Sequence, residues 1–223
     1  MKKRGLIIGA YSTASLWTLS AWALSSPEQF TKYLDVPGRS KGPLDLSTVL
    51  TDDEPTYLSR ELTATLECSE GTRLERKKWI AEMVNELDGG RWEIVFPDDP
   101  HRFAVGRVRV KPIYNDMAHA AVSVSAVCEP WLYNRAETVV VLTATSAKQV
   151  VTLKNSGRLS LVPTVVVEGS GANVLIELDG VSYALSEGTF DTLSRLYLRP
   201  GDTPLTYSGG GTVCIKYREA VLE

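Results

Sequence analysis

The residue types that most often bind metals or act as acids and bases are few in this sequence and lie far apart. The two histidines, His101 and His119, have no further donor at the spacing of a metal site. Asp98 and Asp99 could bind a cation, but they stand between two prolines, and aspartate and proline together favour a tight turn. We therefore expect a solvated turn and predict no metal.

Motifs for nucleophilic catalysis and nucleotide binding are missing as well. The chain has no Gly-x-Ser-x-Gly sequence, no Walker loop and no dinucleotide fingerprint. The triplet Gly209-Gly210-Gly211 precedes a strand-like run, whereas a phosphate-binding loop opens a helix. The sequence thus predicts a protein that is not an enzyme and uses no cofactor.

Composition and charge narrow the possible classes further. The net charge of -3 does not suit a strongly basic nucleic-acid-binding protein. With 223 residues, of which 43% are apolar, the chain can form one large or two small domains with a real core. Cys68, Cys128 and Cys214 are scattered and odd in number, which favours buried reduced thiols over a disulfide framework.

The N-terminal segment allows two interpretations. Three basic residues precede a mostly apolar run that ends in Ala21-Trp22-Ala23, which is the layout of a secretory signal with its cleavage site. The run is repeatedly interrupted by polar residues, however, and Leu16–Ser20 has the mixed composition of a half-buried strand. It is too interrupted for a transmembrane helix. These residues alone leave an exported protein and a structural strand both open.

One helix is predicted, from Thr72 to Leu87. Thr72 and Glu75 form a capping box, and Gly89-Gly90 follows the last turn. Apolar residues recur at helical spacing and should form the buried face: Ile80, Met83, Val84 and Leu87. A charge cluster resembles a phosphate site, but we expect it to form the solvated side of the helix: Glu75, Arg76, Lys77 and Lys78.

A β-hairpin should follow, made of Arg91–Phe96 and Phe103–Val110. Its second run puts Val108 and Val110 on one face and a basic stripe on the other: Arg107, Arg109 and Lys111. The stripe could meet nucleic acid or acidic residues of a neighbouring subunit, and the net charge favours the subunit. The run Ala118–Cys128 then alternates like a strand with one buried face.

The second half of the chain is predicted to consist of strands and turns. Glu129-Pro130-Trp131 breaks the preceding pattern, and we place a domain boundary there, giving domains 1–135 and 136–223. Short strands at regular spacing suggest an antiparallel sandwich. The predicted strands are Thr138–Thr145, Gln149–Leu153, Leu159–Val167, Asn173–Leu178, Leu193–Leu198 and Thr212–Tyr217.

In this order the segments resemble the distal tail protein family of siphophages, the long-tailed, non-contractile bacteriophages, and their prophages. "LWTLSAWALSSPEQFTKYLDVPGRSKGPLDLS" resembles the opening of the family, and "PTYLSRELTATLEC" resembles the strand that follows. "WIAEMVNELDGGRWEIVFPDDPHRFAVGRV" resembles its helix and hairpin, and "NSGRLSLVPTVVVEG" and "LYLRPGDTPLTYSGGGTVCIKYREAVL" resemble its last part. The resemblance covers most of the chain from about Leu16, so it implies that Leu16–Leu24 is a strand and not a discarded leader.

The resemblance implies a mainly β fold with two domains. The first would be a tail-tube-like β-sandwich with one flanking helix and a hairpin, which forms a homohexameric ring. The second would be a galectin-like antiparallel β-sandwich. The ring would be a hub at the distal end of the phage tail, assembled in the host cytoplasm. It would join the tail tube protein and tape measure protein to tail-tip or receptor-binding proteins. Genomic DNA would pass through the lumen of the ring without specific binding.

Two segments are our candidates for the contact between subunits. One is the loop in "VPGRSKGPLDLS", with Pro37, Gly38, Arg39, Lys41 and Leu44, which we expect to be an arm that packs on the adjacent subunit. The other is the basic stripe. An alternative function is a secreted or virion carbohydrate-binding module, but the chain after Leu132 has no Trp, no His and no galectin His-x-Asn-Pro-Arg signature. No membrane partner is predicted.

Overall fold

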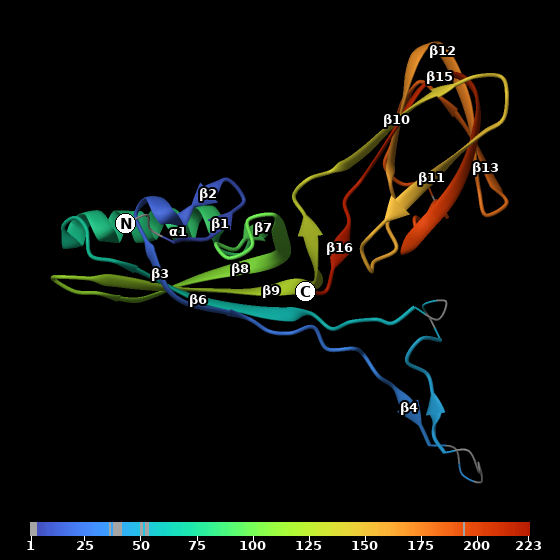
Figure 1. Ribbon diagram of the computed structural model, residues 1–223. Coiled ribbons are helices and arrows are strands. Elements are labelled where there is room, and N and C mark those ends of the chain that lie inside the picture. The colour runs from blue at the N-terminus through green and yellow to red at the C-terminus, as the bar shows by residue number, and fades with distance from the viewer. Residues whose placement is uncertain (1–3, 36, 38–41, 50, 52–53, 194) are drawn as a thin grey trace. The chain divides into compact units, whose positions relative to one another are not determined.

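The computed structural model describes residues 4–35, 37, 42–49, 51, 54–193 and 195–223 (Figure 1). The chain divides into two compact units. Unit 1 comprises Met1–Leu132 with Leu222–Glu223, and unit 2 comprises Tyr133–Val221. Strands dominate both units, and the α-helix of the described residues belongs to unit 1. The predicted mainly β, two-part fold with one helix is confirmed.

Unit 1 is built on a large sheet with the strand order β2-β1-β7-β8-β9-β6-β3. A short 3-10 helix, η1, precedes β3. The bounds are β1 Ile7–Ile8, β2 Tyr11–Ser12, η1 Thr13–Ser15, β3 Thr18–Leu24, β6 Arg60–Cys68, β7 Arg91–Val95, β8 Arg102–Asn115 and β9 Ala120–Asn134. The end of β9 belongs to unit 2, as does β16 (Ala220–Val221), which pairs with β9.

One face of this sheet is buried because apolar and polar residues alternate along its central strands. Leu62 and Leu66 of β6 are fully buried, and they pair in register with Ala126 and Val122 of β9. The alternation predicted for Ala118–Cys128 is confirmed from Val122 to Cys128, whereas Ala121, predicted on the opposite face, is buried.

The helix α1 (Arg73–Leu87) begins at the predicted capping box. The Thr72 hydroxyl accepts a hydrogen bond from the Glu75 backbone N–H, and the Glu75 carboxylate accepts one from the Thr72 backbone N–H. Gly89, at a φ of 77°, allows the chain to reverse into β7. The helix packs against β8. The predicted buried face is confirmed for Ile80, Met83 and Leu87, whereas Val84 is half-buried.

The chain between β3 and β6, residues 25–59, is called the arm, and its described residues form two paired sides. Its two sides are joined by backbone hydrogen bonds, for example from the Phe30 N–H to the Thr56 carbonyl. Farther along, β4 (Tyr33–Leu34) pairs antiparallel with β5 (Leu44–Asp45). The arm is therefore a two-stranded ribbon that prolongs the β3–β6 pair.

Unit 2 is a six-stranded antiparallel sheet with the order β10-β15-β12-β13, in which β11 pairs with β15 and β14 with β12. The bounds are β10 Thr138–Ala144, β11 Gln149–Asn155, β12 Thr164–Leu178, β13 Val181–Ser186, β14 Gly188–Phe190 and β15 Gly201–Tyr217. Its core is apolar and includes Leu153, Val165, Ile176, Leu205 and Ile215.

Some predicted strand limits in unit 2 are wrong. Leu159–Val167 and Asn173–Leu178 belong to a single strand, β12, which begins only at Thr164. The sequence between them looks like a turn because it contains Gly169-Ser170-Gly171. In the structure the register shifts between Glu168 and Asn173 without ending the strand. The short strands β13 and β14 are not among the predicted ones.

The last two predicted strands also differ. In the described part of Leu193–Leu198, only Leu198 takes part in a β-bridge. The run Thr212–Tyr217 is the end of the long strand β15, which passes through the glycine triplet. Gly209 and Gly211 have φ values of 123° and 124°, so they bend the strand in a conformation that other residues rarely adopt.

The predicted strand break at Glu129-Pro130-Trp131 is wrong, because β9 continues to Asn134. Register with β6 ends at Cys128, so Pro130 lies beyond those pairs and its missing N–H costs no hydrogen bond to β6. The division between the two units falls within this same strand.

The N-terminal segment contributes to the folded part of unit 1. Leu6, Ile8 and Trp17 are fully buried, and the strand expected over Leu16–Leu24 is present as β3. The described residues contain no helix with the length and apolar character that crossing a bilayer requires.

Candidate subunit interface

The arm exposes an unusual number of large apolar side chains. Tyr33 is 60% exposed, Leu34 50% and Val49 63%, and Phe30 and Leu58 are exposed as well. Of the predicted interface residues in this region, Pro37 is exposed and Leu44 is half-buried in β5. Gly38, Arg39 and Lys41 lie outside the described residues. The packing of this segment on a second copy stays a prediction.

The basic stripe lies on the exposed face of β8. Arg107, Arg109 and Lys111 are exposed, while Val108 and Val110 between them are buried, as the alternation predicts. Arg107 also donates a hydrogen bond from Nη1 to the Gly89 carbonyl, which ties its side chain to the end of α1.

Arg107 and Arg109 line a shallow groove of about 360 Å³ that we call the sheet groove. Glu61 of β6 and the exposed Val127 of β9 line it too. The surface therefore combines positive, negative and apolar groups, whereas Lys111 lies outside it. A mixed surface of this kind suits contact with a protein better than contact with a phosphate backbone.

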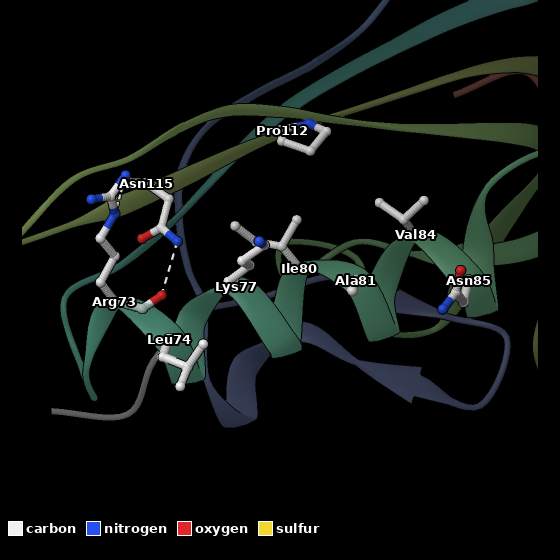
Figure 2. Close-up of a pocket in the computed structure, with 9 residues that line it drawn as sticks. All are labelled: Arg73, Leu74, Lys77, Ile80, Ala81, Val84, Asn85, Pro112 and Asn115. Carbon is white, nitrogen blue, oxygen red and sulfur yellow. Dashed lines mark hydrogen bonds between the residues drawn. The ribbon is translucent and has the colours of Figure 1, made fainter.

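A second and larger groove of about 780 Å³ runs between α1 and β8, and we call it the helix groove. Figure 2 shows its walls, with one side formed by the helix and the other by the end of β8. Arg73 and Asn115 close one end, because the Asn115 amide Nδ2 donates to the Arg73 carbonyl and Arg73 Nε donates to the Asn115 carbonyl. The lining residues are Arg73, Leu74, Lys77, Ile80, Ala81, Val84, Asn85, Pro112 and Asn115.

Sequence reasoning does not find the helix groove, because its walls come from two elements whose approach no local pattern reveals. Its lining residue Leu74 is 65% exposed, and Ile113 and Met117, which follow Pro112 in the sequence, are exposed as well. Lys77 belongs to the predicted charge cluster and is exposed as expected.

Arg76 contradicts the prediction for that cluster, since it is buried with 1% of its surface exposed. Its guanidinium donates to the carbonyls of Glu70 and Gly71 before the helix and to those of Asp116 and Met117 after β8. The helical pattern alone cannot show that these carbonyls converge on one position. Arg76 therefore fixes the chain around the helix start instead of facing solvent.

Asp116 also stabilises the turn after β8, where Arg76 binds two carbonyls. Its carboxylate accepts hydrogen bonds from the backbone N–H groups of His119 and Ala118. These two bonds, the one from His119 first, hold the pKa of Asp116 below its ordinary value. The backbone of His119 thus takes part in a turn that the Asp116 carboxylate stabilises.

Arg60 is a second buried arginine, 4% exposed, which the sequence does not single out. Its Nε donates to the carbonyl of Ser25, the first residue of the arm, at 2.6 Å. Its Nη1 donates to the carbonyl of Leu222 at 2.9 Å. One side chain thus holds the base of the arm and the C-terminal residues that group with unit 1.

The groups considered for chemistry do not come together. The described residues hold no cluster of three or more His, Cys, Asp and Glu side chains that could bind a metal. Cys68 and Cys128 are buried free thiols and Cys214 is half-buried. Burial raises the pKa of the Cys128 thiol to about 11, so it stays protonated and unreactive at neutral pH.

The tyrosines of unit 2 that could stack on a sugar are mostly part of its core. Tyr207 and Tyr217 are buried, and Tyr183 packs against the apolar cluster. Tyr217 also donates its hydroxyl to the Lys154 carbonyl. Tyr197, 47% exposed, is the one left with a face available for a ligand.

The described surface of unit 1 thus combines an apolar arm with two grooves. The fold is similar to that of SPP1 Dit (gp 19.1), whose crystal structure is described as a paradigm of the hub adsorption apparatus in phages that infect Gram-positive bacteria. The TM-score is 0.66 at 17% identity, over 96% of this chain and 98% of that one. No protein-family model and no curated protein sequence matches this chain.

Proposed function

We propose that this protein is a distal tail protein of a siphophage or prophage. The observation that carries the proposal is the fold, which corresponds to SPP1 Dit over nearly the whole length of both chains. The SPP1 protein is described as part of a hub adsorption apparatus. The same role for this chain is structural and needs no catalytic group.

In this proposal six copies form a ring through unit 1. A closed ring requires two different, complementary surfaces on each subunit, because a self-complementary surface gives only a dimer. Unit 1 offers different exposed surfaces in the arm, the sheet groove and the helix groove. The lumen of the ring lets genomic DNA pass without specific binding, in keeping with the net charge of -3.

Unit 2 is proposed as the docking surface for neighbouring tail-tip or receptor-binding proteins. Its strand β10 ends the sheet order, contains no charged residue, and exposes Val139 and Val141. Uncharged edge strands are favourable places for another chain to pair. The other partners are the tail tube and tape measure proteins, and the location is the distal end of the virion tail, after assembly in the host cytoplasm.

Electron microscopy of the purified protein tests the proposal. Negatively stained particles should be rings with sixfold symmetry and a central opening. If the particles have no ring form at any concentration, the hub function is wrong.

A further inference from the structure

Two surfaces of unit 1 expose apolar side chains among the residues that the structure describes. The arm presents Phe30, Tyr33 and Leu34 to solvent, although side chains of this size are rarely left exposed together. The helix groove is lined by the apolar residues Ile80 and Val84 on the helix and Pro112 on the strand (Figure 2), with the exposed Leu74 beside them. None of the described arm residues lines it.

The charges of the two surfaces are opposite. The ionisable residues that line the helix groove are Arg73 and Lys77, both basic. Among the described arm residues, Lys32 is basic and four are acidic: Glu28, Asp35, Asp45 and Glu54. Charge complementarity of this kind selects a partner and its orientation.

We propose that the helix groove is the receptor for the arm of a second copy of this chain. The apolar side chains of the arm contact the apolar residues that line the groove, and the arm carboxylates approach Arg73 and Lys77. The inference rests on the proposed ring function and specifies which surface of the neighbour the arm occupies.

The contact is heterologous, because the arm and the groove are different surfaces of the same chain. Each copy can therefore give its arm to one neighbour and receive an arm from the other, which is what ring closure requires. The sheet groove and its basic stripe remain available for other contacts.

A matched pair of charge reversals tests the groove. Lys77 lines it and the adjacent Lys78 does not, although both are exposed. We expect Lys77→Glu to raise the concentration needed for half-assembly by at least about tenfold, and Lys78→Glu to change it less than about twofold. Lys77→Glu places a carboxylate four residues after Arg73, which supports the helix, so a loss of assembly would not reflect a weaker helix.

A mixing experiment then asks whether arm and groove bind each other. Leu34→Asp disables the arm and Leu74→Asp disables the groove; both side chains are at least half exposed, and aspartate is favourable in the first turn of a helix. Each variant should be monomeric by light scattering. An equimolar mixture should form a one-to-one dimer and stop there, since only one intact arm and one intact groove remain.

The possible failures are distinguishable. If wild type forms rings while Leu74→Asp also forms them, or while the mixture stays monomeric, the arm docks elsewhere and only this inference falls. Equal effects of Lys77→Glu and Lys78→Glu would overturn it too. A wild-type chain that never assembles would overturn the ring function together with this contact.

Discussion

The two units provide hydrogen-bond partners for their buried polar side chains in different ways. In unit 1 the buried guanidinium groups of Arg60 and Arg76 bond to backbone carbonyls of segments distant in sequence. In unit 2 the comparable residue is Asn155, whose Nδ2 donates to the carbonyls of Leu159 and Leu198 and whose Oδ1 accepts the Gly157 N–H. Unit 2 thus relies on a short neutral side chain beside an apolar core.

The difference in these hydrogen bonds reflects which backbone segments each unit must stabilise. The arginines of unit 1 fix the base of the arm and the corner around the start of α1, which are segments with few sheet partners. The long strands of unit 2 pair with one another and need no such support. All five tryptophans lie in unit 1, so tryptophan fluorescence reports on that unit alone.

The largest expected effect is on the buried face of α1. Met83→Asp places a carboxylate where the side chain is fully buried, at a cost of several kcal/mol, comparable to the stability of a whole domain. Tryptophan fluorescence should show unit 1 unfolded in conditions where wild type is folded. The solvent-facing control Lys78→Ala should cost well under 1 kcal/mol. A wild-type melting curve for Met83→Asp would mean that the helix buries another face.

The contact between Arg60 and Leu222 predicts the next largest effect. A chain ending at Val221 loses the carbonyl that accepts the Arg60 Nη1–H, and the partly unsatisfied buried cation should cost about 3 kcal/mol in unit 1. The control Leu222→Ala keeps this carbonyl and should cost about 1 kcal/mol or less. Urea titration followed by tryptophan fluorescence compares them. Equal midpoints for wild type and the shortened chain would exclude a structural role for the contact.

Asn155→Ala should weaken unit 2 only. It removes three hydrogen bonds around the end of β11, and we expect a loss of about 2 kcal/mol. Far-ultraviolet circular dichroism should then show an earlier strand transition, while the tryptophan transition keeps its midpoint. A parallel shift of both signals would mean that the two units unfold together and are not energetically separate.

The smallest effect concerns mild acid. Hydrogen bonds from backbone and hydroxyl groups hold the pKa values of Glu75, Asp45 and Asp116 below their ordinary values, with Thr72, Ser47 and His119 as the main donors. These carboxylates therefore stabilise unit 1 above their ordinary pKa values of about 4, and this stabilisation is lost as the pH falls through the lowered values.

The fluorescence melting temperature should accordingly drop between pH 5 and about pH 3. Glu75→Gln should melt lower at pH 6 and show a smaller drop, because it has already lost the charged cap. An identical pH dependence in Glu75→Gln and wild type would remove the cap from the explanation.

Local patterns were sufficient to predict much of unit 1. The capping box, the buried side of α1 and the faces of β8 and β9 follow from signals within a few residues of each other. Arg76 could not be placed because the carbonyls it binds come from Glu70–Gly71 and from Asp116–Met117, and only the tertiary fold brings them together. The helix groove was missed for the same reason.

Proline and glycine caused the errors in strand assignment. Pro130 was interpreted as a strand end, but a proline is tolerated beyond the last pair with β6. The triplet Gly209-Gly210-Gly211 lies inside β15, where glycine allows a strand to bend while it remains paired with β12. A single sequence does not distinguish a bend of this kind from a turn.

The central claim is that unit 1 closes into a six-membered ring, and native mass spectrometry of the wild-type protein tests it most directly. The predicted spectrum is dominated by an assembly of about six times the 24.4 kDa chain mass, which dissociates when Leu34→Asp is introduced. A single-copy mass at every concentration, or an assembly of any other size, would contradict the claim.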